Sequence, residues 1–235
     1  MLLKLILFSF FAGITILIGG LIANAFNHHV RESPVKYEIT HTLMSFGAGI
    51  ILAAVALVLI PYGMEQLKLL PMALFFVAGA ISFMFLDQYL DKRGGNTATL
   101  LAMMMDFLPE SIAMGAVFAV NTSMATLLAI IIGLQNLPEA FNAFRDLVLS
   151  GMTIKKTLMT FFVLSFLGIP TALFGHYVLS NSATITAQLM TFASGGILYL
   201  LIQDIIPASK LKSNYITALG ATVGFLVGIV GSKIV

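Results

Sequence analysis

The chain of 235 residues has few charged side chains, and that scarcity excludes most soluble proteins. Asp, Glu, Lys and Arg make up 9% of the sequence, whereas they make up about 25% of soluble domains. Hydrophobic residues reach 59%, and the mean hydropathy is +1.02. This composition is typical of an integral membrane protein, in which the lipid bilayer contacts most of the outer surface.

Two further absences narrow the chemistry. Cysteine is missing, so the chain forms neither a disulfide framework nor a thiolate metal site. The net charge is only +2 and no basic cluster occurs, which argues against a nucleic-acid partner.

The N-terminal apolar stretch ends near an A-x-A-like Ala23-Asn24-Ala25. Because that stretch exceeds the roughly 7–15 residues of a signal-peptide core, we expect it to be the first retained span.

Apolar runs long enough to cross a bilayer recur along the whole chain. We expect eight helices, at about 2–25, 41–64, 69–90, 97–120, 123–146, 156–179, 184–207 and 214–235. The connections between them are short, and the longest is expected at 26–40. The sequence therefore predicts an all-α polytopic membrane protein in which residues 1–235 form a single transmembrane domain.

Lysine and arginine are unevenly divided between the two ends of these spans. Nine lie on the odd-numbered connections and three on the opposite side. The nine are Arg31, Lys36, Lys92, Arg93, Arg145, Lys155, Lys156, Lys210 and Lys212. Since basic residues are retained on the cytoplasmic side, both termini are predicted to be extracytoplasmic.

An internal repeat relates the second and seventh spans. SFGAGIILAAVALVLIP (45–61) aligns without gaps on TFASGGILYLLIQDIIP (191–207), and both end in Ile-Pro. The two spans cross the membrane in opposite directions, and inverted repeats are characteristic of secondary transporters. Gln203 and Asp204 stand where the second span has Leu57 and Val58, so we interpret them as a possible ion pathway near the end of the seventh span.

Polar residues interrupt the fourth and fifth spans at matching places. MDFLPES (105–111) and LQNLPEA (134–140) each carry two oxygen-bearing side chains four residues apart, on one helix face. The four residues are Asp106, Glu110, Gln135 and Glu139. Each pair brackets a proline, which bends the helix and frees a backbone carbonyl inside the bilayer.

The short turn between these spans fixes which residues share a depth. In an antiparallel pair joined at 120–123, Asp106 lies level with Glu139, and Glu110 lies level with Gln135. The two layers are about 6 Å apart, from a rise of about 1.5 Å per residue. Three carboxylates this close need a counter-charge, and no Lys or Arg lies in the middle of any span.

The counter-charge could be a bound cation or protons, so three function classes remain open. Oxygen ligands with three negative charges suit a divalent metal, which favours a metal carrier. A proton or monovalent-cation carrier would use the same carboxylates, with less need for Gln135. An intramembrane hydrolase would use two carboxylates to activate water, but no HExxH or comparable signature occurs. Carboxyls that are merely neutral and hydrogen-bonded between helices are the purely structural alternative. We therefore expect a carrier and no enzyme.

The paired motifs resemble the fourth- and fifth-helix motifs of the ZIP (Zrt/Irt-like) metal transporters, such as HNxPEG, and residues 45–61 and 191–207 resemble that family's second and seventh helices. The resemblance implies eight helices in a 3+2+3 arrangement, with helices 1–3 repeated inversely by helices 6–8. It also implies uptake of a divalent metal (Zn, Mn, Fe or Cd) across the plasma membrane into the cytoplasm, and it permits a homodimer. Asp106, Glu110, Gln135 and Glu139 would form the metal site, with Asn136 joining an adjacent second site.

The sequence also departs from the family pattern. Asp106 replaces the usual histidine, Phe107 the asparagine that follows it, and Ile169 an acidic residue before a proline. The remaining ligands are oxygens alone, a set that Mn²⁺ and Fe²⁺ favour and that Zn²⁺ accepts. Because apolar side chains cannot bind a cation, we expect one bound ion in place of two.

Overall fold

The computed structural model describes residues 2–31, 33–211 and 215–234, and helices are the only regular secondary structure in these ranges. Within them, eight helical segments are long and apolar enough to cross a membrane, as the sequence predicts. Five spans are single helices. Two of them form the central hairpin: α5 (Gly95–Phe118) and α6 (Thr122–Leu149). The other three are α1 (Leu2–His29), α4 (Leu69–Arg93) and α11 (Ile216–Ile234).

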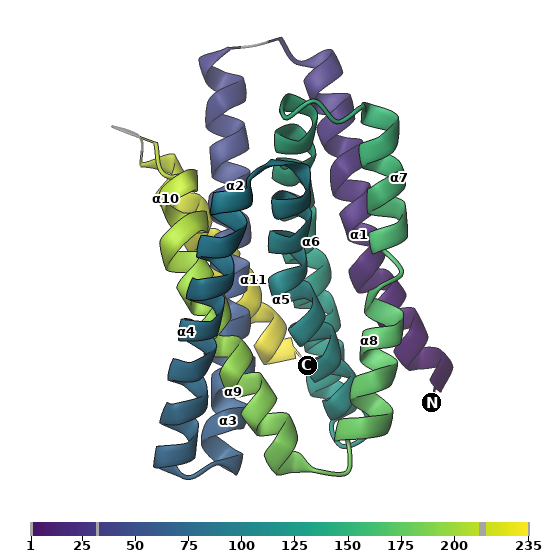
Figure 1. Ribbon diagram of the computed structural model, residues 1–235, viewed down its shortest axis with the longest axis vertical. Coiled ribbons are helices and arrows are strands. Elements are labelled where there is room, and N and C mark those ends of the chain that lie inside the picture. Colours follow the sequence, from purple (N-terminus) through teal and green to yellow (C-terminus); the bar gives the residue numbers. More distant parts are fainter. Residues whose placement is uncertain (1, 32, 212–214, 235) are drawn as a thin grey trace.

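The other three spans contain a π-helical turn. The second consists of α2 (Pro34–Ala54), η1 (Val55–Leu59) and α3 (Ile60–Gln66). The sixth consists of α7 (Ile154–Leu164), α8 (Gly168–Phe174) and η2 (Gly175–Leu179). The seventh consists of α9 (Ala183–Leu200), η3 (Leu201–Ile205) and α10 (Ile206–Ser209). Both labelled chain ends lie in the lower half of Figure 1, opposite the connections after α1, α4 and α6.

The prediction of a long connection at 26–40 is wrong. Helix α1 continues to His29 and α2 begins at Pro34, so only residues 30–33 separate them. The side chain of Ser33 caps α2 by accepting a hydrogen bond from the backbone N–H of Lys36 at 3.1 Å. Proline directly after a serine cap favours the first helical turn, and this signal outweighs the polar composition of the segment. Lys212, counted among the basic residues, lies outside the described ranges.

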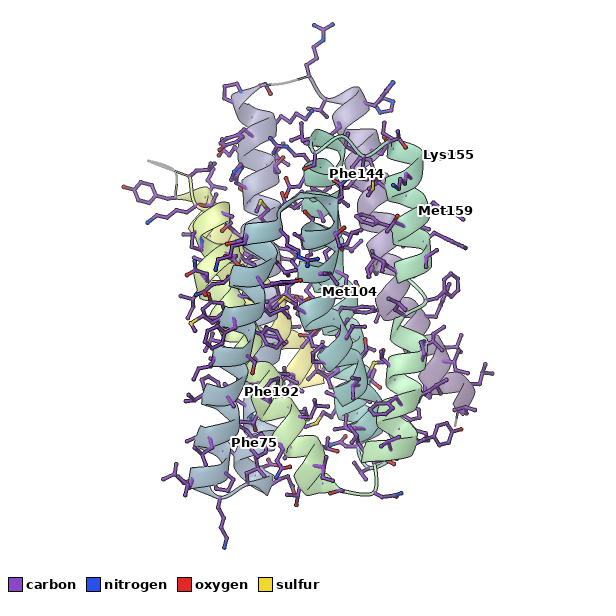
Figure 2. All side chains as sticks on the ribbon, in the orientation of Figure 1. Phe75, Met104, Phe144, Lys155, Met159 and Phe192 are labelled. Atoms are coloured by element: carbon purple, nitrogen blue, oxygen red, sulfur yellow. The ribbon has the colours of Figure 1, made fainter. Side chains whose placement is uncertain are left out.

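The spans pack in two groups. Helix α1 packs against α6, and α5 packs against α8, in the group on the right of Figure 1. Helix α2 packs against α11, and α4 packs against α9, in the group on the left. Side chains between the packed helices are buried, whereas side chains on the outer surface of the bundle are exposed. Phe144 on α6 is 1% exposed, whereas Met159 on α7 is 61% exposed and points away from the bundle (Figure 2).

The sequence repeat has matching local structure. The π-turns η1 and η3 begin at Val55 and Leu201, an offset of 146 residues, and each precedes the Ile-Pro pair that the two halves of the repeat share. A Cβ atom added to Gly49 on α2 would lie 1.9 Å from the carbonyl oxygen of Ala221. A Cβ atom added to Gly195 on α9 would lie 1.9 Å from the carbonyl oxygen of Phe76. Equivalent glycines therefore let equivalent backbones touch. The 3+2+3 arrangement itself stays a prediction.

Candidate functional site

The hairpin of α5 and α6 forms as the sequence predicts. Asn121 caps α6, because its side chain accepts a hydrogen bond from the backbone N–H of Met124 at 2.9 Å. Pro109 lies inside α5 and Pro138 inside α6, and neither proline ends its helix. The two polar motifs therefore face each other along continuous helices, with only the residues between Phe118 and Thr122 as a turn.

Glu110 and Gln135 lie side by side, as their level positions in the hairpin predict. The side-chain amide of Gln135 donates a hydrogen bond of 2.5 Å to Oε2 of Glu110, across the hairpin. Glu110 is 0% exposed and Gln135 is 1% exposed. The remaining oxygens, Oε1 of each side chain, are buried without a hydrogen-bond partner among the described residues. Buried acceptors of this kind are costly unless a donor or a cation satisfies them.

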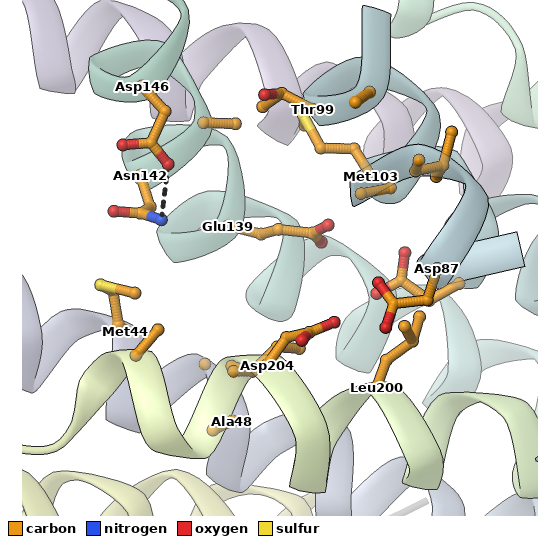
Figure 3. Close-up of a pocket in the computed structure, with 18 of the residues that line it drawn as sticks. Met44, Ala48, Asp87, Thr99, Met103, Glu139, Asn142, Asp146, Leu200 and Asp204 are labelled. Carbon is orange, nitrogen blue, oxygen red and sulfur yellow. Dashed lines mark hydrogen bonds between the residues drawn. The ribbon is translucent and has the colours of Figure 1, made fainter. Parts of the chain in front are cut away.

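The second layer faces a cavity of about 420 Å³ between α2, α4, α5, α6 and the end of the seventh span. Asp106 and Glu139 both line it, together with Gln135. Asp106 is 4% exposed, and its Oδ1 accepts a hydrogen bond from the backbone N–H of Phe107 at 2.8 Å. Glu139 is partly exposed and extends into the cavity (Figure 3).

The cavity is strongly acidic. Six of the chain's ten Asp and Glu residues line it, and no Lys, Arg or His belongs to the lining that the described residues form. The six are Asp87, Asp91, Asp106, Glu139, Asp146 and Asp204. We call this cavity the vestibule. It runs from Gln135 inside the hairpin to Gly94 and Gly95 at the connection between α4 and α5.

Only one of the two predicted pathway residues lines the vestibule. Asp204 does so, and Figure 3 shows its side chain pointing toward Asp87. Gln203 does not belong to the lining, and its side chain is exposed. Neighbouring positions of a helix point in different directions, so the two residues cannot share one face.

Sequence reasoning missed three members of the vestibule. Asp87 and Asp91 lie one turn apart near the end of α4, and Asp146 lies near the end of α6. Their spacing puts Asp87 and Asp91 on one face of the helix, which is a signal that the sequence offered. Carboxylates near the end of a span ordinarily lie at the membrane interface, so this signal did not point to a site. In the structure Asp87 is 9% exposed, and the hydroxyl of Tyr199 on α9 donates a hydrogen bond to it at 3.2 Å. Asn142 donates to Asp146 at 3.4 Å (Figure 3).

The region of the expected second site is occupied by other contacts. The Asn136 side chain donates a hydrogen bond to the carbonyl oxygen of Ala12 on α1 at 2.8 Å, and Asn136 does not line the vestibule. Phe107 is 0% exposed and packs so closely on Gly168 of α8 that an added Cβ there would lie 2.9 Å from its ring. Asn136 thus holds α6 against α1, and the residues of a second site are not gathered.

The carboxylates share a region without converging on one point. In residues 2–31, 33–211 and 215–234, no group of three or more His, Asp or Glu side chains is arranged closely enough to hold a metal ion. Asp106, Glu110 and Glu139 lie on facing turns of one hairpin. A cation held by all three therefore requires their side chains to rotate toward one another.

Comparison with known proteins adds no assignment. No model of a protein family matches the chain, and no curated protein matches its sequence. The likeness to ZIP transporters accordingly rests on the two paired motifs and on the repeat.

Proposed function

We propose that this protein carries divalent metal cations across a membrane, with Asp106, Glu110, Gln135 and Glu139 as the transport site. The observation that carries the proposal is that Asp106, Gln135 and Glu139 lie at the inner end of the vestibule. Six carboxylates line this cavity, and no basic side chain does so among the residues that the structure describes. Beyond the site, α5 and α6 bury Met114, Leu128 and Ile132 at 0% exposure. A cation thus has an approach from one side and an apolar barrier on the other.

The buried oxygen atoms of the site are more stable with a bound cation than without one. Carboxylates in a low-dielectric interior repel one another, and each costs several kcal/mol to bury without a partner. Oε1 of Glu110 and Oε1 of Gln135 are buried acceptors that a cation would satisfy together. Carboxylate and amide oxygens are the ligands of hard divalent ions, and rotation of Asp106 and Glu139 toward them would complete the set.

The direction follows from the charge bias of the connections. Basic residues favour the end of the bundle where the vestibule opens, so that end is assigned to the cytoplasm and both termini to the outside. Metal would then leave the site inward, and the plasma membrane is the membrane proposed. Alternating access about a site near the midplane is the general mechanism of such carriers. Single cysteines at Gly151 and Ser33 should resist an impermeant thiol reagent in intact cells.

The ligand set also indicates which metals are carried. It contains neither imidazole nor thiolate, so Mn²⁺ and Fe²⁺ are favoured, with Zn²⁺ and Cd²⁺ as weaker substrates. One ion per chain is proposed, because Phe107 packs on α8 and Asn136 bonds to α1 where a second ion would need ligands.

Metal uptake by cells that express the chain tests the proposal. Wild type should accumulate Mn²⁺, whereas Glu139→Gln should not. Glu65→Gln is the matched control, because Glu65 is an exposed carboxylate on α3 outside the vestibule. The purified protein should be stabilised against heat by Mn²⁺. Stabilisation by Na⁺ or by a change of pH, without an effect of Mn²⁺, would instead favour a monovalent-cation or proton carrier.

A further inference from the structure

The acidic residues of the vestibule extend well beyond the transport site. Asp87 and Asp91 come from α4, Asp204 from η3 and Asp146 from α6, so three different spans surround the opening with negative charge. Walls of one charge sign and low dielectric raise the local concentration of counter-ions and speed their association. Divalent cations on this side of the membrane are therefore concentrated at the opening.

The vestibule also leads directly to an unsatisfied ligand. Gln135 lines its inner end and is 1% exposed, and Oε1 of that side chain has no hydrogen-bond partner among the described residues. Asp106 and Glu139 line the same inner end. A cation that enters from the vestibule side thus reaches three of the four proposed ligands within one cavity.

The position that matches Asp204 in the other half of the repeat carries no charge. Asp204 in η3 corresponds to Val58 in η1, and Val58 is 1% exposed inside the apolar core. Of the two matching π-turns, only η3 therefore carries a carboxylate, and it lies where the vestibule opens.

We propose that the vestibule makes the carrier sensitive to the metal that it delivers. Divalent cations that accumulate on the vestibule side are drawn back to the transport site, and they slow further transport by keeping that site occupied. The inference rests on the proposed function and adds its regulation: inhibition by the product ion, at a concentration set by Asp87, Asp91 and their acidic neighbours.

Flux in membrane vesicles of known sidedness tests the proposal. Flux of labelled Mn²⁺ toward the vestibule side is measured while unlabelled Mn²⁺ on that side is raised, and each variant is normalised to its own flux without that addition. The half-inhibitory concentration should rise about tenfold in Asp87→Asn/Asp91→Asn, within the range expected for a charged cleft. Glu65→Gln should match wild type, because Glu65 lies outside the vestibule.

Salt provides a second measurement that needs no variant. At about 0.3 M KCl, the distance over which exposed charges attract an ion falls below about 10 Å. This weaker attraction should raise the half-inhibitory concentration of wild type. An equal half-inhibitory concentration in wild type and the double variant, together with no effect of salt, overturns the proposal. Labelled flux that increases with unlabelled Mn²⁺ on the vestibule side also overturns it. Absence of any Mn²⁺ flux in wild type would instead refute the proposed function, and this inference with it.

Discussion

The second and seventh spans share a scaffold and differ in charge. Both have a π-turn before an Ile-Pro pair, and both use a glycine to let a neighbouring backbone approach, α11 in one case and α4 in the other. At the π-turn, however, one span has Leu57 and Val58 where the other has Gln203 and Asp204. The backbone packing of the two spans is alike, while only the seventh span contributes a carboxylate at its π-turn to the vestibule. The difference indicates that the packing of a span and the charge at its π-turn can vary independently.

The central hairpin lies between the two halves, and its variants should have the largest effect. Glu110→Ala and Glu139→Ala should each abolish Mn²⁺ uptake, because each removes an anionic ligand from a site that has three. Membrane insertion should persist, since both helices keep their apolar surfaces. Uptake and surface abundance are measured together in the same cells. Normal uptake by either well-inserted variant would place the site elsewhere.

Glycine substitutions test whether the two halves are equivalent as scaffolds. Gly49→Ala and Gly195→Ala should each lower thermal stability, by about 1–3 kcal/mol if the backbones can separate. In both cases the new Cβ would meet a backbone carbonyl oxygen at 1.9 Å. Gly231→Ala is the control, because its Cβ would meet only the flexible end of Leu127 at 3.1 Å. Thermal unfolding in detergent should show similar losses for the first two, and a loss in only one would break the equivalence.

The charge difference between the two matching π-turns can be removed by a single substitution. Asp204→Val gives the seventh span the residue of the second, and it should reduce Mn²⁺ flux several-fold without abolishing it. Asp204 lines the vestibule but lies on a different helix from the four proposed ligands. Initial rates over a range of Mn²⁺ concentrations measure the effect. Complete loss of flux would mean that Asp204 belongs to the transport site itself.

The smallest expected effect is a change in metal preference. Asp106→His should shift the ranking toward Zn²⁺ and lower Mn²⁺ uptake, because Zn²⁺ prefers nitrogen ligands to oxygen. Competition between labelled Mn²⁺ and unlabelled Zn²⁺ measures the ranking. An unchanged ranking would show that selectivity is set by residues other than the direct ligands.

Local features of the sequence determined the eight spans and the pairing of Glu110 with Gln135 in the hairpin. Glu110 and Gln135 could be paired in advance because a short turn, capped by Asn121, fixes the register of an antiparallel hairpin. None of the three π-turns was predicted, although η1 and η3 each precede a proline that removes a backbone donor. The boundary before Pro34 was misjudged, because polar composition concealed a serine cap.

Tertiary structure alone decided which distant residues share the vestibule and which leave the site. Asp87, Asp146 and Asp204 line one cavity because α4, α6 and η3 surround it, and no residue spacing along the chain specifies that. Asn136 stands next to Gln135 in sequence, yet it bonds to Ala12 because α1 packs against that side of α6. Spacing fixes relations within a helix or across a tight turn, whereas contacts between spans depend on the packing of the whole bundle.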